Sequence, residues 1–143
     1  MRQLSGRLGR LTLVVCAVIV SAACSSSGSR SRAGRAVLQV REQDFRIVVR
    51  PKRIPAGDYE LVLKNDGPVA HELILVRGRS RLPLRSDGLT VDEDALSTSG
   101  ALEPAGPGSV RRLRLHLAPG RYELFCNMAG HFMAGMHAEL AVD

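Results

Sequence analysis

The residues best suited to chemistry lie near the C-terminus, in the segment 126–136 (CNMAGHFMAGM). Within it, Cys126, His131 and Met136 stand five residues apart and offer a thiolate, an imidazole and a thioether. Joined by a second imidazole, these donors make the trigonal His2Cys site with a weak axial Met that suits copper in electron transfer. The rest of the chain must then supply a second histidine, a rigid scaffold and a suitable compartment.

The chain has four histidines, and strand parity separates them, because successive side chains of a strand point to opposite faces. His116 lies on the polar face of its strand, and His137 lies opposite Met136, so both are expected at the surface. His71 instead shares a face with Leu73, at the mouth of an interior strand. His71 is therefore the best candidate for the second imidazole.

The N-terminus has the pattern of an exported protein. Residues 1–23 place three arginines before an apolar stretch over 11–23, which is typical of a secretory signal. That stretch is shorter than the roughly 20 residues that a membrane-spanning helix needs. Ser21-Ala22-Ala23-Cys24 resembles the lipobox of bacterial lipoproteins, which implies that Cys24 is lipidated, with ordinary cleavage nearby as the alternative. We expect a membrane lipoprotein that faces outside the cytoplasm, on the periplasmic or extracellular side.

Cysteine usage supports a metal at Cys126. Cys16 falls inside the signal and Cys24 at the lipidation site, so Cys126 remains unpaired. In an oxidising compartment an unpaired thiol is a liability unless it is used or buried. A metal is the simplest use.

The charge balance argues against a nucleic-acid partner. The net charge of +6 includes the three arginines of the signal, and from Cys24 onward 17 basic and 14 acidic side chains remain. Arginines cluster at 77–81 and 111–114, but the chain has only two Tyr, three Phe and no Trp to interleave with them. Nucleic-acid binding therefore has weak support, and these arginines are predicted to form a solvated face that could meet anionic lipid or an acidic partner.

After a Ser/Gly/Arg-rich linker over 24–34, residues 35–143 form one predicted domain. Its patterning is that of short strands separated by turns with Gly, Pro, Asn or Asp, which predicts an all-β fold, an antiparallel β-sandwich. Residues 80–108 lack this pattern and are predicted to be a long crossing loop with one helical turn near 91–96. The strand signals are alternation over 45–49, 58–64 and 112–117, and a continuous apolar run over 73–76.

Two further strands position the donors. Parity over 121–126 places Cys126 on the inward face, and parity over 136–142 does the same for Met136. Gly130 and Gly135 allow tight turns between them, so the loop can fold back and bring both sulfurs to His131.

With these motifs the chain resembles the cupredoxins, the blue-copper family that includes plastocyanin, azurin and rusticyanin. The resemblance spans roughly residues 36–143, and the Cys-x4-His-x4-Met spacing is most similar to a rusticyanin-type ligand loop. It implies a Greek-key β-sandwich that holds one copper ion. The implied ligands are His71, Cys126 and His131 in the equatorial positions and Met136 in the axial position. Met128 and Met133 lie in the same loop and are the alternatives for the axial position, but each is short of the spacing in related loops.

Four neighbours of these ligands are candidates for positioning or docking roles. Many blue-copper proteins have Asn or Ser after the first His, where the side chain ties the two ligand loops together, and here that residue is Glu72. Asn127 follows the cysteine directly. Phe132 and Met133 are predicted to form an apolar rim beside His131, where a partner could dock.

The predicted function is a type 1 copper protein that carries single electrons at the outer face of the cell membrane. Its partner would be a redox protein or respiratory complex, and a monomer is expected. The extra thioethers of Met128 and Met133 leave open a Cu(I) chaperone or copper-resistance protein that hands copper to an acceptor, and a metal-free structural β-sandwich is a second alternative. No enzyme is expected, because the chain lacks the His-x-His pairs of copper oxidases.

Overall fold

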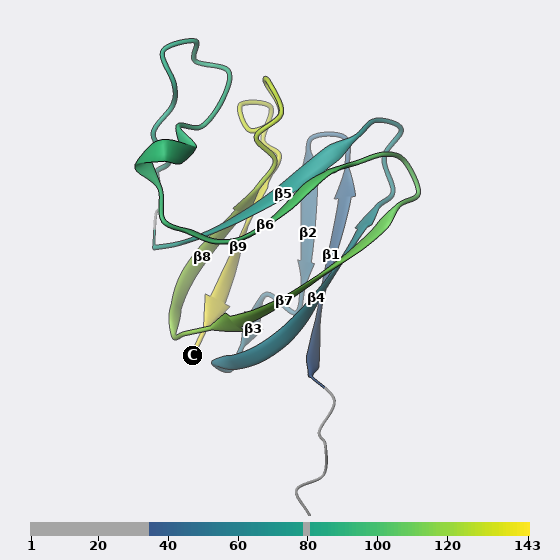
Figure 1. Ribbon diagram of the computed structural model, residues 1–143, viewed down its shortest axis with the longest axis vertical. Coiled ribbons are helices and arrows are strands. Elements are labelled where there is room, and N and C mark those ends of the chain that lie inside the picture. Colours follow the sequence, from purple (N-terminus) through teal and green to yellow (C-terminus); the bar gives the residue numbers. More distant parts are fainter. Residues whose placement is uncertain (1–34, 79–80) are drawn as a thin grey trace, which may run out of the picture. The chain divides into compact units, whose positions relative to one another are not determined.

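The computed structural model describes residues 35–78 and 81–143, and these form two β-sheets with a shared core (Figure 1). The predicted signal and linker lie outside the described residues. The four-stranded sheet has the order β2-β1-β4-β7 and consists of β1 (Ala36–Gln43), β2 (Arg46–Arg50), β4 (Gly57–Asn65) and β7 (Val110–Leu117). The five-stranded sheet has the order β3-β9-β8-β5-β6 and consists of β3 (Arg53–Ile54), β5 (His71–Arg77), β6 (Thr98–Ala105), β8 (Gly120–Phe125) and β9 (His137–Val142).

The all-β sandwich predicted from the sequence is confirmed, but its strands are not all antiparallel. β1 runs parallel to β4 and β3 runs parallel to β9, whereas the other strand pairs of the described chain are antiparallel. After β2 the chain crosses to the other sheet as β3 and returns as β4, so β4 lies beside β1 in the same direction. Among the described residues, no helix has the length and hydrophobicity to span a bilayer.

The core forms where the inner faces of the two sheets meet. Leu38 and Leu61 of one sheet and Leu75 and Leu124 of the other are almost completely buried, and burying a side chain of this size contributes about 1.5–3 kcal/mol. Cys126 and Met136 belong to the same buried cluster. The parity predictions for the strands before and after the ligand loop are therefore confirmed.

The long loop predicted over 80–108 is only partly correct. One 3-10 turn, η1 (Glu93–Ala95), occurs where a helical turn was expected, but the last third of the segment is the edge strand β6, paired with β5. β6 escapes detection because it is mostly exposed and carries Gly and Pro in place of an alternating pattern. The loop before it buries Leu82 and Val91 against the outer face of β5 and β8, so the apolar run over 73–76 is covered on both sides, as predicted.

Phe45 is not the strand residue that the sequence pattern predicts. Ile47 and Val49 point into the core as expected, but Phe45 lies in the two-residue turn between β1 and β2, with φ of 56° and half of its surface exposed. A bulky residue at positive φ is unusual. The turn overrides the alternation at this position and leaves the aromatic ring at one end of the sandwich.

One charged residue breaks the apolar pattern of the core. Parity along β1 turns Glu42 inward with Leu38 and Val40. Its side chain is fully buried, and neither carboxylate oxygen has a hydrogen-bond partner among the described residues. Burial, with a smaller contribution from the charge of Glu72, raises the pKa of Glu42 from 4.5 to about 8. Glu42 is therefore a neutral acid in the folded protein at neutral pH.

Glu42 should make the folded state less stable as the pH rises. Between pH 4.5 and about 8 the folded chain keeps a proton that the unfolded chain has lost, so the free energy of unfolding falls across this window, by up to about 5 kcal/mol. Glu42→Gln removes this dependence, which denaturant titrations across the window can measure. Asp94→Asn, at an exposed position, should keep the wild-type slope. Equal slopes in the wild type and Glu42→Gln would contradict this account.

Candidate metal centre

Three of the four predicted ligands meet at one end of the sandwich. His71 begins β5 and Cys126 follows β8 directly, and the antiparallel register that pairs Ile74 with Phe125 places these two strand ends together. His131 comes from the loop between β8 and β9. One donor atom from each of the three lies within 4.8 Å of the other two, with His71 and Cys126 fully buried.

The ligand loop is closed by its own backbone, which returns Met136 to the side of Cys126. The Cys126 N–H donates to the Met136 carbonyl at 3.1 Å, and the Met136 N–H donates to the His131 carbonyl at 3.0 Å. Gly130 and Gly135 take φ values of 81° and 97°, which favour glycine at both turns. The buried Met136 side chain belongs to the same core cluster as Cys126, so the fourth predicted donor is also at this end of the core.

The ring of His71 is oriented by a carboxylate that the sequence analysis did not single out. Asp44, in the β1–β2 turn, places Oδ1 3.3 Å from His71 Nε2. Since a carboxylate only accepts, Nε2 carries the hydrogen and Nδ1 is left with a bare lone pair. Nδ1 faces His131 Nδ1 at 3.3 Å. Burial lowers the pKa of His71, against the opposing effect of Asp44, which favours the neutral imidazole that metals bind.

The surroundings of Cys126 oppose ionisation of its thiol in the absence of a nearby cation. Burial raises the pKa of its thiol, while the backbone N–H groups of Glu72 and Met128 favour the thiolate. Its Sγ lies 3.4 Å from His131 Nδ1. The protein thus supplies hydrogen-bond donors to the sulfur, and a bound cation would complete the stabilisation of its charge.

Glu72 connects the two ligand-bearing segments although it is neither Asn nor Ser. The backbone N–H of Asn127 stabilises its carboxylate, but burial and the charges of Glu93 and Glu103 prevail and raise its pKa. The Asn127 side chain donates to Glu93 at 2.6 Å and accepts from the Val91 N–H at 2.5 Å. These contacts fix the ligand loop to the long loop over the outer face.

Of the two residues predicted to form an apolar rim beside His131, only Met133 has the exposed position expected of it. Met133 is 54% exposed, as a rim residue should be. Phe132 instead packs between Phe125 and His137 on the outer face of the sheet. Phe45, which the sequence analysis assigned to a strand, stands edge-on to the His131 ring with centroids 5.5 Å apart.

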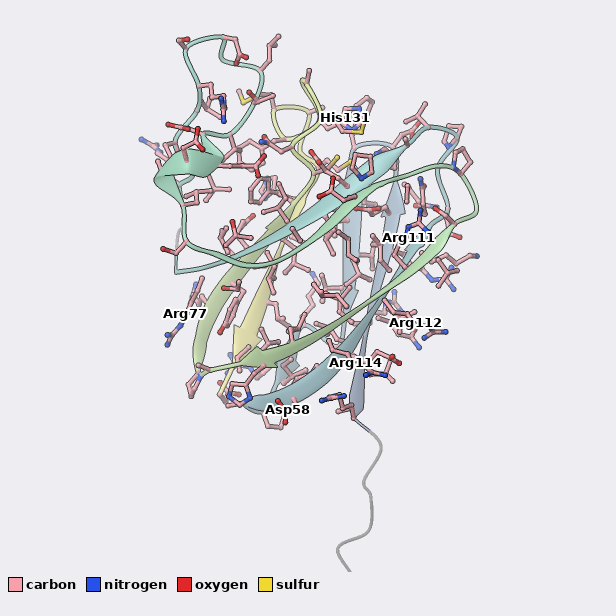
Figure 2. All side chains as sticks on the ribbon, in the orientation of Figure 1. Asp58, Arg77, Arg111, Arg112, Arg114 and His131 are labelled. Carbon is pink, nitrogen blue, oxygen red and sulfur yellow. The ribbon has the colours of Figure 1, made fainter. Side chains whose placement is uncertain are left out.

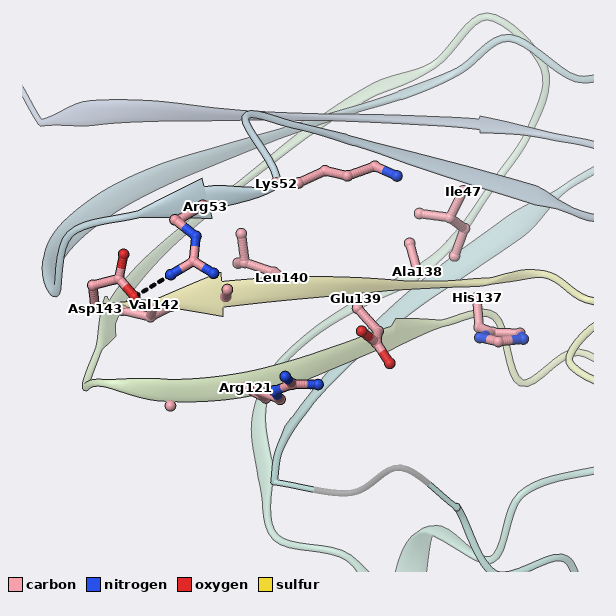
Figure 3. Close-up of a pocket in the computed structure, with 12 residues that line it drawn as sticks. Ile47, Lys52, Arg53, Arg121, His137, Ala138, Glu139, Leu140, Val142 and Asp143 are labelled. Atoms are coloured by element: carbon pink, nitrogen blue, oxygen red, sulfur yellow. Dashed lines mark hydrogen bonds and ion pairs between the residues drawn. The ribbon is translucent and has the colours of Figure 1, made fainter.

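The other two histidines are outside this cluster. His116 is exposed and bonded to Asp58 at 2.9 Å. His137 is half exposed and bonded to Glu123 at 2.6 Å. A groove of about 840 Å³ runs along β9 beside His137 (Figure 3), and none of the four predicted ligands lines it. The donor cluster is therefore separate from this groove.

In the turn before His71, a side chain at Gly67 would crowd Asp44 and His71. A Cβ there would lie 2.9 Å from Asp44 Oδ1 and 3.0 Å from His71 Nε2. The turn is held by the buried side chain of Asn65, which accepts from the Gly67 N–H and donates to the carbonyls of Val69 and Ala105. Backbone, carboxylate and imidazole are thus packed against one another.

Gly67→Ala should displace His71 and weaken the Asp44 contact. We expect the free energy of unfolding to fall by about 1–3 kcal/mol and the ring NMR signals of His71 to shift, with lower affinity for a metal. Gly106→Ala is the matched control, since a Cβ at Gly106 meets nothing within 4 Å, and its effect should stay within about 0.5 kcal/mol. Similar effects in both variants would show that the close packing at Gly67 is unimportant.

The described domain has the cupredoxin fold, as comparison with solved structures shows. Auracyanin from Roseiflexus castenholzii aligns with a TM-score of 0.61 and 19% identity over 78% of this chain and 98% of its own. Auracyanin A, a "blue" copper protein from Chloroflexus aurantiacus, aligns with a TM-score of 0.57 and 18% identity over 77% of this chain and 100% of its own. Rusticyanin from Thiobacillus ferrooxidans aligns with a TM-score of 0.57 and 14% identity over 75% of this chain and 77% of its own. No protein-family model and no curated protein matches the sequence.

Proposed function

We propose that this protein is a type 1 copper protein that carries single electrons. The observation that carries the proposal is the convergence of His71 Nδ1, His131 Nδ1 and Cys126 Sγ within 4.8 Å of one another at a buried end of the sandwich. With Met136 beside them, these donors are the set that suits copper in electron transfer. The auracyanin and rusticyanin neighbours support the proposal through the fold.

The donor chemistry fits a cation better than it fits an empty site. The Nδ1 lone pair of His71 faces a second ring nitrogen and a thiol, and the Asp44 carboxylate lies on the far side of the ring. A metal ion would accept a lone pair from each of the two ring nitrogens and would replace the proton of the Cys126 thiol. When bound, copper would alternate between Cu(I) and Cu(II), while the protein holds the four donors in one geometry and limits reorganisation.

Electrons would enter and leave over His131. His71 and Cys126 are fully buried, whereas His131 is partly exposed at the end of the sandwich (Figure 2). Exposed apolar side chains at this end come from Phe45, Val69 and Met133. We propose that a redox protein or a respiratory complex docks here, since a small apolar surface excludes water while leaving contact transient.

We further propose that the protein is exported and held at the outer face of the cell membrane by a lipid on Cys24. The support is the N-terminal sequence, with its charged start, apolar stretch and Ser-Ala-Ala-Cys segment. The thiol of Cys24 would be consumed by lipidation, which leaves Cys126 for the metal.

Copper delivery is the second candidate function, and exposed thioethers would favour it. Met133 is exposed, but Met128 packs against the core, so the surface offers one additional thioether for handing over Cu(I). A carrier must cycle with its copper retained, whereas a chaperone must release copper to an acceptor. No catalytic role is proposed.

The visible spectrum of the copper-loaded protein tests the proposal. We expect an intense thiolate-to-copper absorption that bleaches with ascorbate, returns on oxidation, and is absent from Cys126→Ser. Met136→Leu should keep the colour and shift the reduction potential, because the axial ligand tunes the potential. Met133→Leu is the matched control and should leave the potential unchanged.

Two results would contradict the carrier. Unchanged colour in the Cys126→Ser variant would show that Cys126 does not bind the copper. A colourless wild type that binds only Cu(I) and releases it to a chelating acceptor would favour copper delivery, and a protein without copper affinity would be a structural sandwich.

A further inference from the structure

The charges of the domain are segregated. Residues 35–143 carry 15 lysines and arginines and 14 aspartates and glutamates. The outward face of the four-stranded sheet, here called the basic face, nevertheless carries six cations against three acids at its surface or end. The cations are Arg41, Arg46, Arg50, Lys64, Arg112 and Arg114, and the acids are Asp58, Glu60 and Asp66.

Strand register arranges these cations in rows across the sheet. One row runs Arg50, Gln39, Val62, Arg112, and the neighbouring row aligns Arg41 with Lys64 between two valines. Figure 2 shows Arg112 and Arg114 one after the other along β7, on the flank opposite Arg77. The basic face therefore combines exposed guanidinium groups with an apolar floor.

Half of the cations of the basic face have no ion-pair partner in the part of the chain that the structure describes. Arg41 and Lys64 share Asp66, and Arg112 pairs with Glu60. For Arg46, Arg50 and Arg114 no ion pair occurs within the described residues. Two shallow hollows, of about 340 and 390 Å³, lie between the side chains of this face. Arg, Val and Gln side chains line both hollows, Lys64 also lines the first and Asp66 also lines the second. This excess of cations suits phosphate groups of an extended surface.

The tether that precedes this face is short in sequence. β1, an interior strand of the same sheet, begins at Ala36, so only 11 residues, 25–35, separate it from Cys24. Fully extended, such a segment reaches about 40 Å. It contains Arg30, Arg32 and Arg35 and no acidic residue. This step rests on the lipid anchor proposed above, whereas the charge segregation does not.

We propose that the basic face binds the anionic phospholipid surface of the membrane to which the chain is attached. A lipid anchor and a basic surface are the two signals that together give stable membrane attachment. The other residues of 35–143 hold nine lysines and arginines against eleven aspartates and glutamates, among them the loop residues Asp87, Asp92, Glu93 and Asp94. An anionic bilayer therefore attracts the basic face more strongly than the rest of the domain, which orients the domain.

The test measures binding to vesicles in the absence of the lipid anchor. The mature chain from residue 24, with Cys24→Ser, is sedimented with vesicles of phosphatidylcholine alone or mixed with phosphatidylglycerol, at low and high ionic strength. Binding should require phosphatidylglycerol and weaken with salt. The triple variant Arg46→Gln/Arg50→Gln/Arg114→Gln should bind at least about tenfold more weakly, since each cation near an anionic surface contributes about fivefold.

The matched control is Arg81→Gln/Arg85→Gln/Arg121→Gln, which removes the same charge from exposed positions outside the basic face and should bind like the wild type. Equal loss in both triple variants would overturn the proposal, because net charge alone would then explain binding. Absence of any dependence on phosphatidylglycerol would also overturn it and would favour an acidic protein as partner. The copper absorption of each variant is read in parallel, so failure of the metal centre is recognised separately.

Discussion

The antiparallel register between β5 and β8 is the constraint on which the candidate metal centre depends. It sets the first residue of β5 beside the residue that follows β8, so that an imidazole and a thiol from distant parts of the chain meet in a buried place. A slip of one residue would turn one of the two side chains to the opposite face of the sheet. The apolar residues behind them, Leu73 and Leu124, must be inside for the core to form. Packing of the core therefore enforces the geometry of the donors.

Around this pair the protein uses short polar contacts where the core meets solvent. Asp44 accepts from one imidazole ring, Asn65 ties the turn that precedes that ring to the Ala105 carbonyl of β6, and Asn127 ties the ligand loop to Glu93 in the outer loop. Each of these three contacts joins segments that are distant in the sequence. Glu42 is the exception. Its carboxyl group is buried without a hydrogen-bond partner among the described residues, and its burial lowers the stability of the folded state at neutral pH.

The sequence was informative where a local rule decides the structure. Parity alone placed Cys126 and Met136 on inward faces and separated His71 from His116, because a strand with one buried face has a period of two. It failed where tertiary pairing decides. Phe45 continued an alternating pattern but occupies a turn, and Asp44 gave no signal because its contact with His71 spans 27 residues. β6 was missed because an exposed edge strand needs no apolar alternation.

The close approach of the three donors also has a kinetic consequence. Backbone hydrogen bonds in the ligand loop and packing of the core fix their positions, so little chain entropy remains to be lost when an ion is captured. Loading and removal of an ion should not require the sandwich to unfold. Because two of the three donors are buried and the third is partly exposed, we expect an ion to enter and leave past the side chain of His131, and the rate of exchange to depend on movement of that side chain.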